Sequence, residues 1–170
     1  MVKKNLILLG MMAVGKTTLG KIVAKRQNLT FIDTDVVIEK KNLMTISEIF
    51  KKKGEKFFRM EEEKQILKLL KKDSNIIALG GGAFMNKMLR DNILKNAVSI
   101  WLDAPIKILN SRIKKNLKRP LLDKKNNQSK LEKLYKERKN IYKLANYKID
   151  CKKLNKEDIA KKIITFYEKY

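Results

Sequence analysis

Gly10-Met-Met-Ala-Val-Gly-Lys-Thr-Thr18 matches the phosphate-binding pattern G-x-x-x-x-G-K-S/T. In this pattern successive backbone N–H groups surround a phosphate, the lysine neutralises its charge and the next hydroxyl reaches a magnesium ion. The apolar run Asn5–Leu9 precedes the pattern, and apolar residues at helical spacing follow it. The loop is therefore expected to join a buried strand to the positive end of a helix, where anions are favoured.

The same region has some features of a secretory signal peptide, because Lys3 and Lys4 precede an apolar run over residues 6–14. However, Gly10 interrupts this run, Lys16 follows it directly and no convincing small-residue cleavage site is present. We therefore expect the region to belong to the folded protein.

Composition limits the class of protein. A chain of 170 residues, of which 44% are hydrophobic, is expected to form one domain with a real core. No apolar stretch approaches the roughly 20 residues that cross a bilayer. One cysteine, Cys151, and no histidine exclude an internal disulfide, histidine-based triads and Cys/His zinc sites. A single thiol also fits the cytoplasm, which is where we expect the protein.

The formal net charge of +23 raises the possibility of nucleic-acid binding. The excess is nearly all lysine, spread along the chain without an aromatic-interleaved patch, so we interpret it as solvated surface that also attracts anionic substrates. No nucleic-acid partner is expected. The six arginines are more informative, because a guanidinium group forms a planar fork for carboxylate or phosphate.

Apolar segments of strand length alternate with helical patterns along the chain, which indicates an α/β fold with a parallel sheet. The predicted strands are 5–9, 29–32, 75–79, 97–102 and 147–150. A further motif, N-K-x-D at 155–158, is typical of guanine-binding GTPases, but no D-x-x-G accompanies it. We interpret it as a helix cap. Thr45 with Glu48 likewise predicts a capping box that opens a short helix, which Gly54 separates from the next helical segment.

Two carboxylates, Asp33 and Asp35, follow the second predicted strand. The carboxyl ends of parallel strands face the ligand crevice, so both should lie near the phosphate loop. Carboxylates beside a triphosphate are repelled unless a metal or a substrate proton requires them. We expect Asp33 to support Mg²⁺ through water and Asp35 to face the acceptor hydroxyl. A helix cap would explain one of the two carboxylates, but hardly both.

Arg59 and the glycines at 80–82 are further candidates. Arg59 lies early in a predicted helix over 55–72, and its spacing alone favours a surface ion pair with Glu62 or Glu63, worth under about 1 kcal/mol. Three glycines at the end of the third strand let a ligand approach the backbone where a Cβ would block it. A flexible turn is the alternative interpretation of the glycines.

Residues 114–130 are polar and lysine-rich apart from Arg119-Pro-Leu-Leu122. This composition is expected of a lid that closes over phosphates. A disordered surface loop is the alternative, and both descriptions could hold without ligand.

Together these motifs resemble the shikimate kinase family of small P-loop kinases, over nearly the whole chain. The residues that carry the resemblance are Gly10–Gly20, Asp33–Asp35, Ile38-Glu39, Ile46–Phe50, Gly54-Glu55, Phe58-Arg59, Glu62, Gly80–Gly82, Arg119–Leu122, and Arg138 with Tyr142 and Ala145. The resemblance implies a P-loop NTPase fold, with a five-stranded parallel sheet in the order 2-3-1-4-5 and helices on both faces. It also implies one kinase domain over 1–170, with substrate-binding helices at about 34–72 and the lid at about 114–130.

The resemblance further implies ATP-dependent, Mg²⁺-assisted phosphorylation of the 3-hydroxyl of shikimate, a step of aromatic amino-acid biosynthesis. The residues implied to bind ATP are Ala13, Val14, Gly15, Lys16, Thr17, Thr18, Arg112 and Arg119. Those implied to bind shikimate are Asp35, Arg59, Gly81 and Arg138. Thr17 and Asp33 are implied to bind the metal, and Lys16, Asp35 and Arg119 to serve catalysis. Shikimate and ATP are the expected partners of a monomer that does not bind membranes.

Two positions depart from the family pattern. Ala13-Val14 replaces the more usual Gly-Ala, which requires Ala13 to tolerate its backbone angles. Asn140 replaces a usual proline after Arg138, which puts substrate affinity in question. Gluconate kinase would share the loop and lid, although paired arginines and the glycine turn favour a carboxylated cyclic polyol. A nucleic-acid-binding protein with incidental ATP hydrolysis is the alternative of another class.

Overall fold

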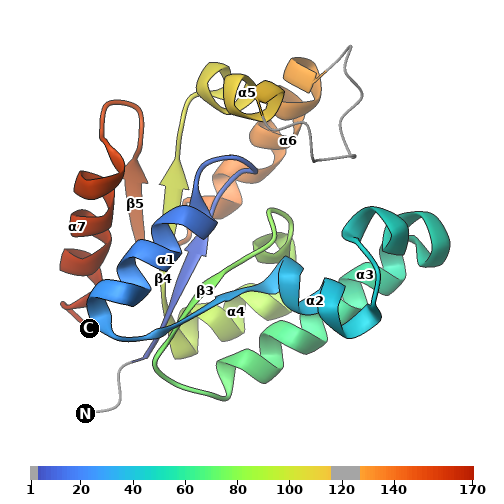
Figure 1. Cartoon of the computed structure of the whole chain (residues 1–170), viewed down its shortest axis with the longest axis horizontal. Helices are drawn as coiled ribbons and strands as arrows, with labels where there is room; N and C mark the ends of the chain where they lie inside the picture. The colour runs from blue at the N-terminus through green and yellow to red at the C-terminus, as the bar shows by residue number, and fades with distance from the viewer. Residues whose placement is uncertain (1–3, 116–126) are drawn as a thin grey trace.

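A five-stranded parallel sheet forms the centre of the computed structural model, which describes residues 4–115 and 127–170 (Figure 1). Its strands are β1 (Asn5–Leu9), β2 (Thr30–Asp33), β3 (Asn75–Ala78), β4 (Ala97–Asp103) and β5 (Tyr147–Asp150). Their order is β2-β3-β1-β4-β5, which confirms the order predicted above. In the register of the central strand, Leu6 lies opposite Ile76 of β3 and Val98 of β4.

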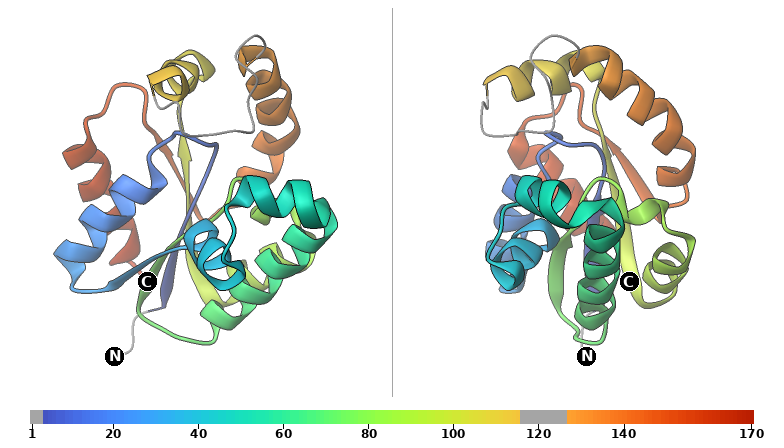
Figure 2. Two further views of the ribbon diagram at one scale, coloured as in Figure 1. Left: turned by 45° about the vertical axis from the view of Figure 1, so that its right-hand side comes forward. Right: turned by 90° about the vertical axis from the view of Figure 1, so that its right-hand side faces the viewer.

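Helices cover both faces of the sheet. They are α1 (Lys16–Gln27), α2 (Thr34–Asn42), α3 (Ile46–Leu70), the short 3-10 helix η1 (Ala83–Met85), α4 (Lys87–Asn96), α5 (Ile106–Lys115), α6 (Asn127–Tyr142) and α7 (Lys156–Tyr167). Figure 2 shows α1 and α7 on one face, with α3 and α4 on the other. The helices α5 and the start of α6 lie beyond the carboxyl edge of the sheet (Figure 1). The phosphate loop therefore opens toward α5 and α6.

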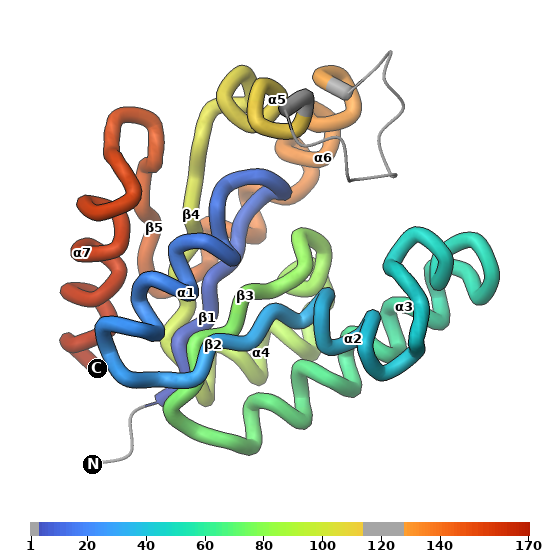
Figure 3. Tube along the Cα trace, in the orientation of Figure 1, coloured from blue at the N-terminus to red at the C-terminus, as the bar shows by residue number. Residues whose placement is uncertain are grey.

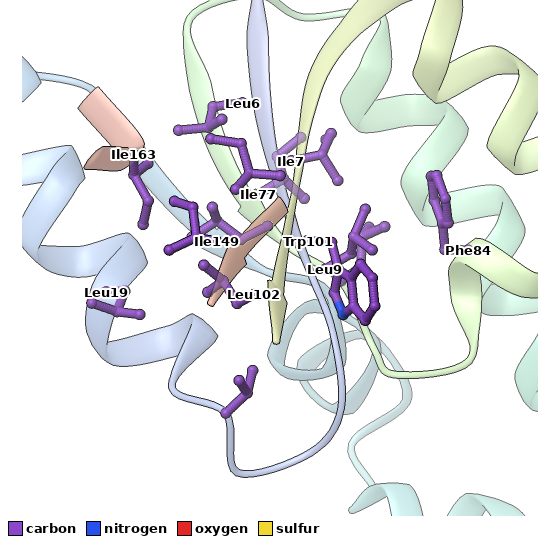
Figure 4. Packing of buried hydrophobic residues seen from close by; sticks show 14 of the residues in the cluster. Leu6, Ile7, Leu9, Leu19, Ile77, Phe84, Trp101, Leu102, Ile149 and Ile163 are labelled. Atoms are coloured by element: carbon purple, nitrogen blue, oxygen red, sulfur yellow. The ribbon is translucent and has the colours of Figure 1, made fainter. Parts of the chain in front are cut away.

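The core explains why the strand sequences are continuously apolar. All five residues of β1 are buried, as expected for the central strand of a sheet that is covered on both faces. Figure 4 shows Leu19 and Ile163 of the α1/α7 layer on one side of the sheet, and Phe84 and Trp101 on the other. Because the strands between these layers are parallel, their carboxyl ends all lie at the same edge of the sheet.

The ends of the described chain meet at the amino edge of the sheet (Figure 3). The hydroxyl of Tyr167 at the end of α7 donates a 2.5 Å hydrogen bond to the carbonyl of Lys4. This contact is remote from the phosphate loop, which lies at the opposite edge.

The two parts of α3 match the prediction, because Gly54, with a non-helical φ of 81° that glycine adopts readily, separates the capped first helix from the helix that follows and ends at Leu70. Two other features differ from the sequence-based expectation. The helix α4 was not predicted, although Asn86 caps it by accepting a 3.2 Å hydrogen bond from the N–H of Leu89. Residues 127–130, assigned above to the lid, form the first turn of α6.

Two predicted helix caps are confirmed. Thr45 and Glu48 form a reciprocal capping box at the start of α3. The N-K-x-D motif is also a cap, because the side chain of Asn155 accepts a 2.9 Å hydrogen bond from the N–H of Asp158. Across the described part of the chain, no helix combines the length and the apolar character that crossing a membrane would need.

Candidate active site

The loop between β1 and α1 has the backbone of a phosphate-binding loop. Gly10, Ala13 and Gly15 adopt positive φ angles of 140°, 63° and 108°. The side chain of Lys16 folds back over the loop, since its Nζ donates hydrogen bonds to the carbonyls of Gly10 at 2.8 Å and Met11 at 3.1 Å. The lysine ammonium thus lies over the cradle that successive N–H groups offer to an anion.

Each carboxylate oxygen of Asp33 accepts a different hydrogen bond. Its Oδ1 accepts a 3.1 Å hydrogen bond from the N–H of Asp35 and caps α2, while its Oδ2 accepts a 2.7 Å hydrogen bond from Oγ1 of Thr17. The cap predicted for one carboxylate is therefore present. The pair of oxygen atoms fits a hard divalent cation such as Mg²⁺, which prefers carboxylate, hydroxyl and water ligands.

The glycine turn after β3 lies against Asp35 and Arg59, which the resemblance assigns to shikimate, and against Glu62. A Cβ at Gly80 would be only 2.7 Å from both Oδ1 of Asp35 and Oε1 of Glu62, and one at Gly82 would be 2.7 Å from Nη1 of Arg59. Real Cβ atoms do not make such contacts. The absence of side chains at these positions therefore lets two carboxylates and a guanidinium group converge on the backbone.

Gly81 connects this cluster with the phosphate loop. A Cβ at Gly81 would lie 3.0 Å from Nη1 of Arg138 and 3.8 Å from the carbonyl of Gly10. The turn at 80–82 is thus in reach of both the loop and the side chains predicted to bind the acceptor. This close approach supports the interpretation of the glycines as a ligand-facing backbone.

Arg59 is paired with a buried carboxylate. Its Nη1 donates a 2.7 Å hydrogen bond to Oε2 of Glu62, whose side chain is 2% exposed, and its Nη2 lies 3.2 Å from Oε1 of Glu55. Burial opposes the charge of Arg59, but Glu62 and Glu55 outweigh this effect and raise its pKa. The ion pair with Glu62 was expected, but as a surface contact rather than one with a buried partner.

The surroundings of Glu62 disfavour the charged form of its carboxyl group. Burial raises the pKa of its carboxyl, Arg59 opposes that shift, and the nearby Asp35 adds to it. Its Oε1 has no hydrogen-bond partner among the described residues, although it faces the turn at Gly80. Such a carboxylate is retained at a cost in stability, which is typical of a functional site.

A cavity of about 570 Å³ adjoins this cluster. It lies between α3, the segment from η1 to the start of α4, and α6. The residues that line it are Glu55, Arg59, Glu62, Gly82, Met85, Asn86, Lys87, Leu89, Glu137 and Arg138. Its volume is within the usual range for small-molecule sites, and its lining includes both Arg59 and Arg138, which the family resemblance assigns to shikimate.

Of the two arginines that the resemblance assigns to ATP, Arg112 lies among the described residues and Arg119 does not. Nη1 of Arg112 donates to the carbonyls of Ala13 at 3.2 Å and Val14 at 3.1 Å, so this arginine lies against the phosphate loop. Arg119 and most of the predicted lid lie outside the described residues.

Thr34 was not assigned a role from the sequence. Its Oγ1 donates to the carbonyl of Ala78 at 3.2 Å and accepts a 3.0 Å hydrogen bond from the N–H of Gly80. Thr34 therefore ties the start of α2 to the glycine turn. Its position between two aspartates was the only signal in the sequence.

A phosphate loop beside a cavity whose lining includes two arginines and three glutamates, on a 2-3-1-4-5 sheet, defines a P-loop kinase that acts on a small molecule. The chain belongs to the shikimate kinase family, because the model of that family matches residues 12–168. Its activity is the ATP-dependent phosphorylation of shikimate.

Individual relatives agree with this assignment. The chain is 41% identical to the shikimate kinase of Bartonella henselae over 98% of its own length and 80% of the relative. It is also 41% identical to that of Thermoanaerobacter pseudethanolicus, with 96% of each chain covered. The structure of Acinetobacter baumannii shikimate kinase in complex with shikimate superimposes with a TM-score of 0.92 at 32% identity, covering 98% of this chain and 94% of that one.

Proposed function

We propose that the chain transfers the γ-phosphate of ATP to the 3-hydroxyl of shikimate, with Mg²⁺ as the divalent metal. The observation that carries this proposal is the position of Gly81 between Gly10 of the phosphate loop and Arg138 of the cavity. A phosphoryl group bound by the loop and a hydroxyl held in the cavity would meet at this turn. Phosphoryl transfer needs such alignment and little covalent chemistry from the protein.

The phosphate loop would hold ATP through the backbone and side chains of residues 13–18. Lys16 would exchange the carbonyls of Gly10 and Met11 for phosphate oxygens, since an ammonium is better satisfied by an anion than by a neutral carbonyl. Arg112 would face the adenine from α5, while its contacts with Ala13 and Val14 keep the loop in shape.

Thr17 and Asp33 would hold the magnesium ion, Thr17 by direct ligation and Asp33 through water. The ion supplies charge neutralisation at the phosphate oxygens. Their 2.7 Å contact places the hydroxyl and the carboxylate at the same end of the loop, as this role requires.

Charged side chains and a backbone N–H group would together bind shikimate, the acceptor. Arg59 and Arg138 would bind its carboxylate with two guanidinium forks, and the N–H of Gly81 would donate to one of its hydroxyl oxygens. Asp35 would orient the 3-hydroxyl and accept its proton as the oxygen attacks phosphorus. The proximity of Asp35 to Gly80 supports this role, because the turn and the carboxylate then face the same acceptor.

Arg119 would close over the transferring phosphate from the lid and neutralise charge in the transition state. Loss of such a charge clamp lowers turnover by about an order of magnitude or more. Arg119→Ala should therefore lower kcat, measured at saturating substrates, by at least about tenfold. We also propose that the protein acts as a monomer in the cytoplasm without a nucleic-acid partner.

A coupled assay of ADP release with ATP and Mg²⁺ tests the proposal, comparing shikimate, gluconate and no acceptor. Release that requires shikimate is expected, and NMR of the product should place the phosphate on the 3-oxygen. Release with gluconate instead, or without dependence on any acceptor, would overturn the acceptor assignment. In the latter case, RNA binding with a steep salt dependence would favour the nucleic-acid alternative.

A further inference from the structure

Tyr142, the last residue of α6, links two groups of the acceptor site through one oxygen atom. Its hydroxyl donates a hydrogen bond to the carbonyl of Gly81 and also makes a hydrogen bond with the side chain of Arg138. A guanidinium group can only donate, so the tyrosine oxygen accepts from Arg138 while its proton goes to Gly81. The hydroxyl is thus a relay between a side chain and a backbone group that both face the acceptor.

The contact fixes the direction of the Gly81–Gly82 peptide. A trans peptide is planar, and its carbonyl and N–H point to opposite sides. Holding the carbonyl of Gly81 against Tyr142 therefore turns the N–H of Gly82 away from Tyr142. The Gly81–Gly82 unit has no side chains to restrict it, whereas Gly80 is already tied by Thr34 and Ala83 by Gly80.

The ring and the hydroxyl of Tyr142 have separable functions. Its side chain is 1% exposed, and its ring lies 5.9 Å from the ring of Trp101 in the core. Burial raises the pKa of the phenol, Arg138 opposes that shift, and Glu62 adds to it. The hydroxyl therefore keeps its proton at neutral pH and remains a donor to Gly81.

We propose that Tyr142 is a positioning residue for shikimate, whose hydroxyl holds Arg138 and the Gly81–Gly82 peptide in the arrangement that receives the acceptor. The inference rests on the proposed function, because it takes Arg138 and the glycine turn as acceptor contacts. We expect its effect on shikimate and not on ATP, since the two groups that the hydroxyl holds, the side chain of Arg138 and the carbonyl of Gly81, both belong to residues proposed to bind the acceptor.

Tyr142→Phe separates the two functions, because it keeps the ring against Trp101 and removes only the oxygen. We expect the KM for shikimate to rise about three- to tenfold, as for the loss of one buried hydrogen bond, with kcat and the KM for ATP changed less than about twofold. Tyr167→Phe is the matched control, because it removes another buried hydroxyl that donates to a backbone carbonyl, that of Lys4, far from the site. It should leave the KM for shikimate unchanged.

A double-mutant cycle with Arg138→Lys gives a readout that a merely structural role would not move. If Tyr142 acts through Arg138, the effect of Tyr142→Phe on the KM for shikimate shrinks in the Arg138→Lys background. An unchanged KM in Tyr142→Phe, an equal rise in Tyr167→Phe, or full additivity with Arg138→Lys would overturn the inference. If Arg138→Lys alone leaves the KM unchanged, the acceptor site itself has been misassigned and the proposed function fails with it.

Discussion

Oγ1 of Thr17 donates a 2.7 Å hydrogen bond to Oδ2 of Asp33, which joins the start of α1 to the end of β2. In the sequence, most of α1 lies between the two residues. Their contact brings the oxygen donors proposed for the magnesium ion into one place.

Asp33→Asn tests the metal site, because asparagine still caps α2 but lacks the negative charge. Loss of a residue that orients metal ligands typically costs about 10- to 100-fold in metal affinity, so the Mg²⁺ concentration for half-maximal activity should rise by that factor. Initial rates over a Mg²⁺ titration measure it. The KM for shikimate at saturating Mg²⁺ serves as the control, and an unchanged Mg²⁺ midpoint would exclude Asp33 from the site.

Arg59→Lys tests the acceptor site, because lysine keeps the charge and loses the bidentate fork. The KM for shikimate should rise about 10- to 100-fold, the range expected for hydrogen bonds to a charged group, while the KM for ATP stays constant. Arg26→Lys is the matched control, since Arg26 pairs with the exposed Glu157 on the α1/α7 face. The assignment of Arg59 fails if both variants retain the wild-type KM.

Ala13→Gly tests the strain in the phosphate loop. Ala13 has a φ of 63°, which costs an L-residue about 1–2 kcal/mol, while glycine gives back about 0.4–1 kcal/mol through the greater freedom of its unfolded chain. The difference between the two ranges is about 0 to 1.6 kcal/mol, so the free energy of unfolding should increase by about 0.8 kcal/mol, the middle of that range, as measured by urea denaturation. Asn28→Gly is the control, because Asn28 also has a positive φ, of 53°, but asparagine tolerates it. A loss of stability in Ala13→Gly would show that the loop carries no such strain.

Cys151 should be almost unreactive in the folded protein. Burial is the main cause that raises its pKa from 9.0 to about 11, so at pH 8 far less thiolate is present than in the unfolded chain. Labelling with a thiol reagent at pH 8 should be at least about 100-fold slower in buffer than in denaturing urea. Rapid labelling of the native protein would contradict the burial of the thiol.

The same shift predicts a pH dependence of stability. The native protein binds this proton more tightly than the unfolded chain, so the stabilisation is complete below the unfolded pKa and is lost as pH rises through about 11. Cys151→Ala should remove this part of the decline between about pH 9 and 11, which denaturation curves across that range can measure.

Local chemistry explains what the sequence could predict. The phosphate loop, the cap at Asn155 and the capping box at Thr45 each depend on residues within a few positions of one another. The strand order followed from the family resemblance. Helix α4 was missed because its polar residues leave little more than Leu89 and Ile93 buried.

Non-local contacts explain the rest. Spacing showed that Glu62 could pair with Arg59, but its burial follows from the fold, which brings the turn at Gly80 against its Oε1. The role of Tyr142 depends likewise on Gly81, 61 residues away. Arg112 was assigned to adenine by resemblance, and only the fold revealed its contacts with Ala13 and Val14.

The charges that line the cavity determine how ionic strength affects the binding of shikimate to this highly charged protein. Among the residues that the structure describes, three acidic side chains, Glu55, Glu62 and Glu137, line it together with three basic ones, so the formal charges of this part of its lining cancel although the chain carries +23. Long-range attraction of anions therefore comes from lysines outside the cavity, and salt screens it over about 10 Å at 0.1 M. Added salt should slow the capture of shikimate while leaving its residence time in the cavity nearly constant.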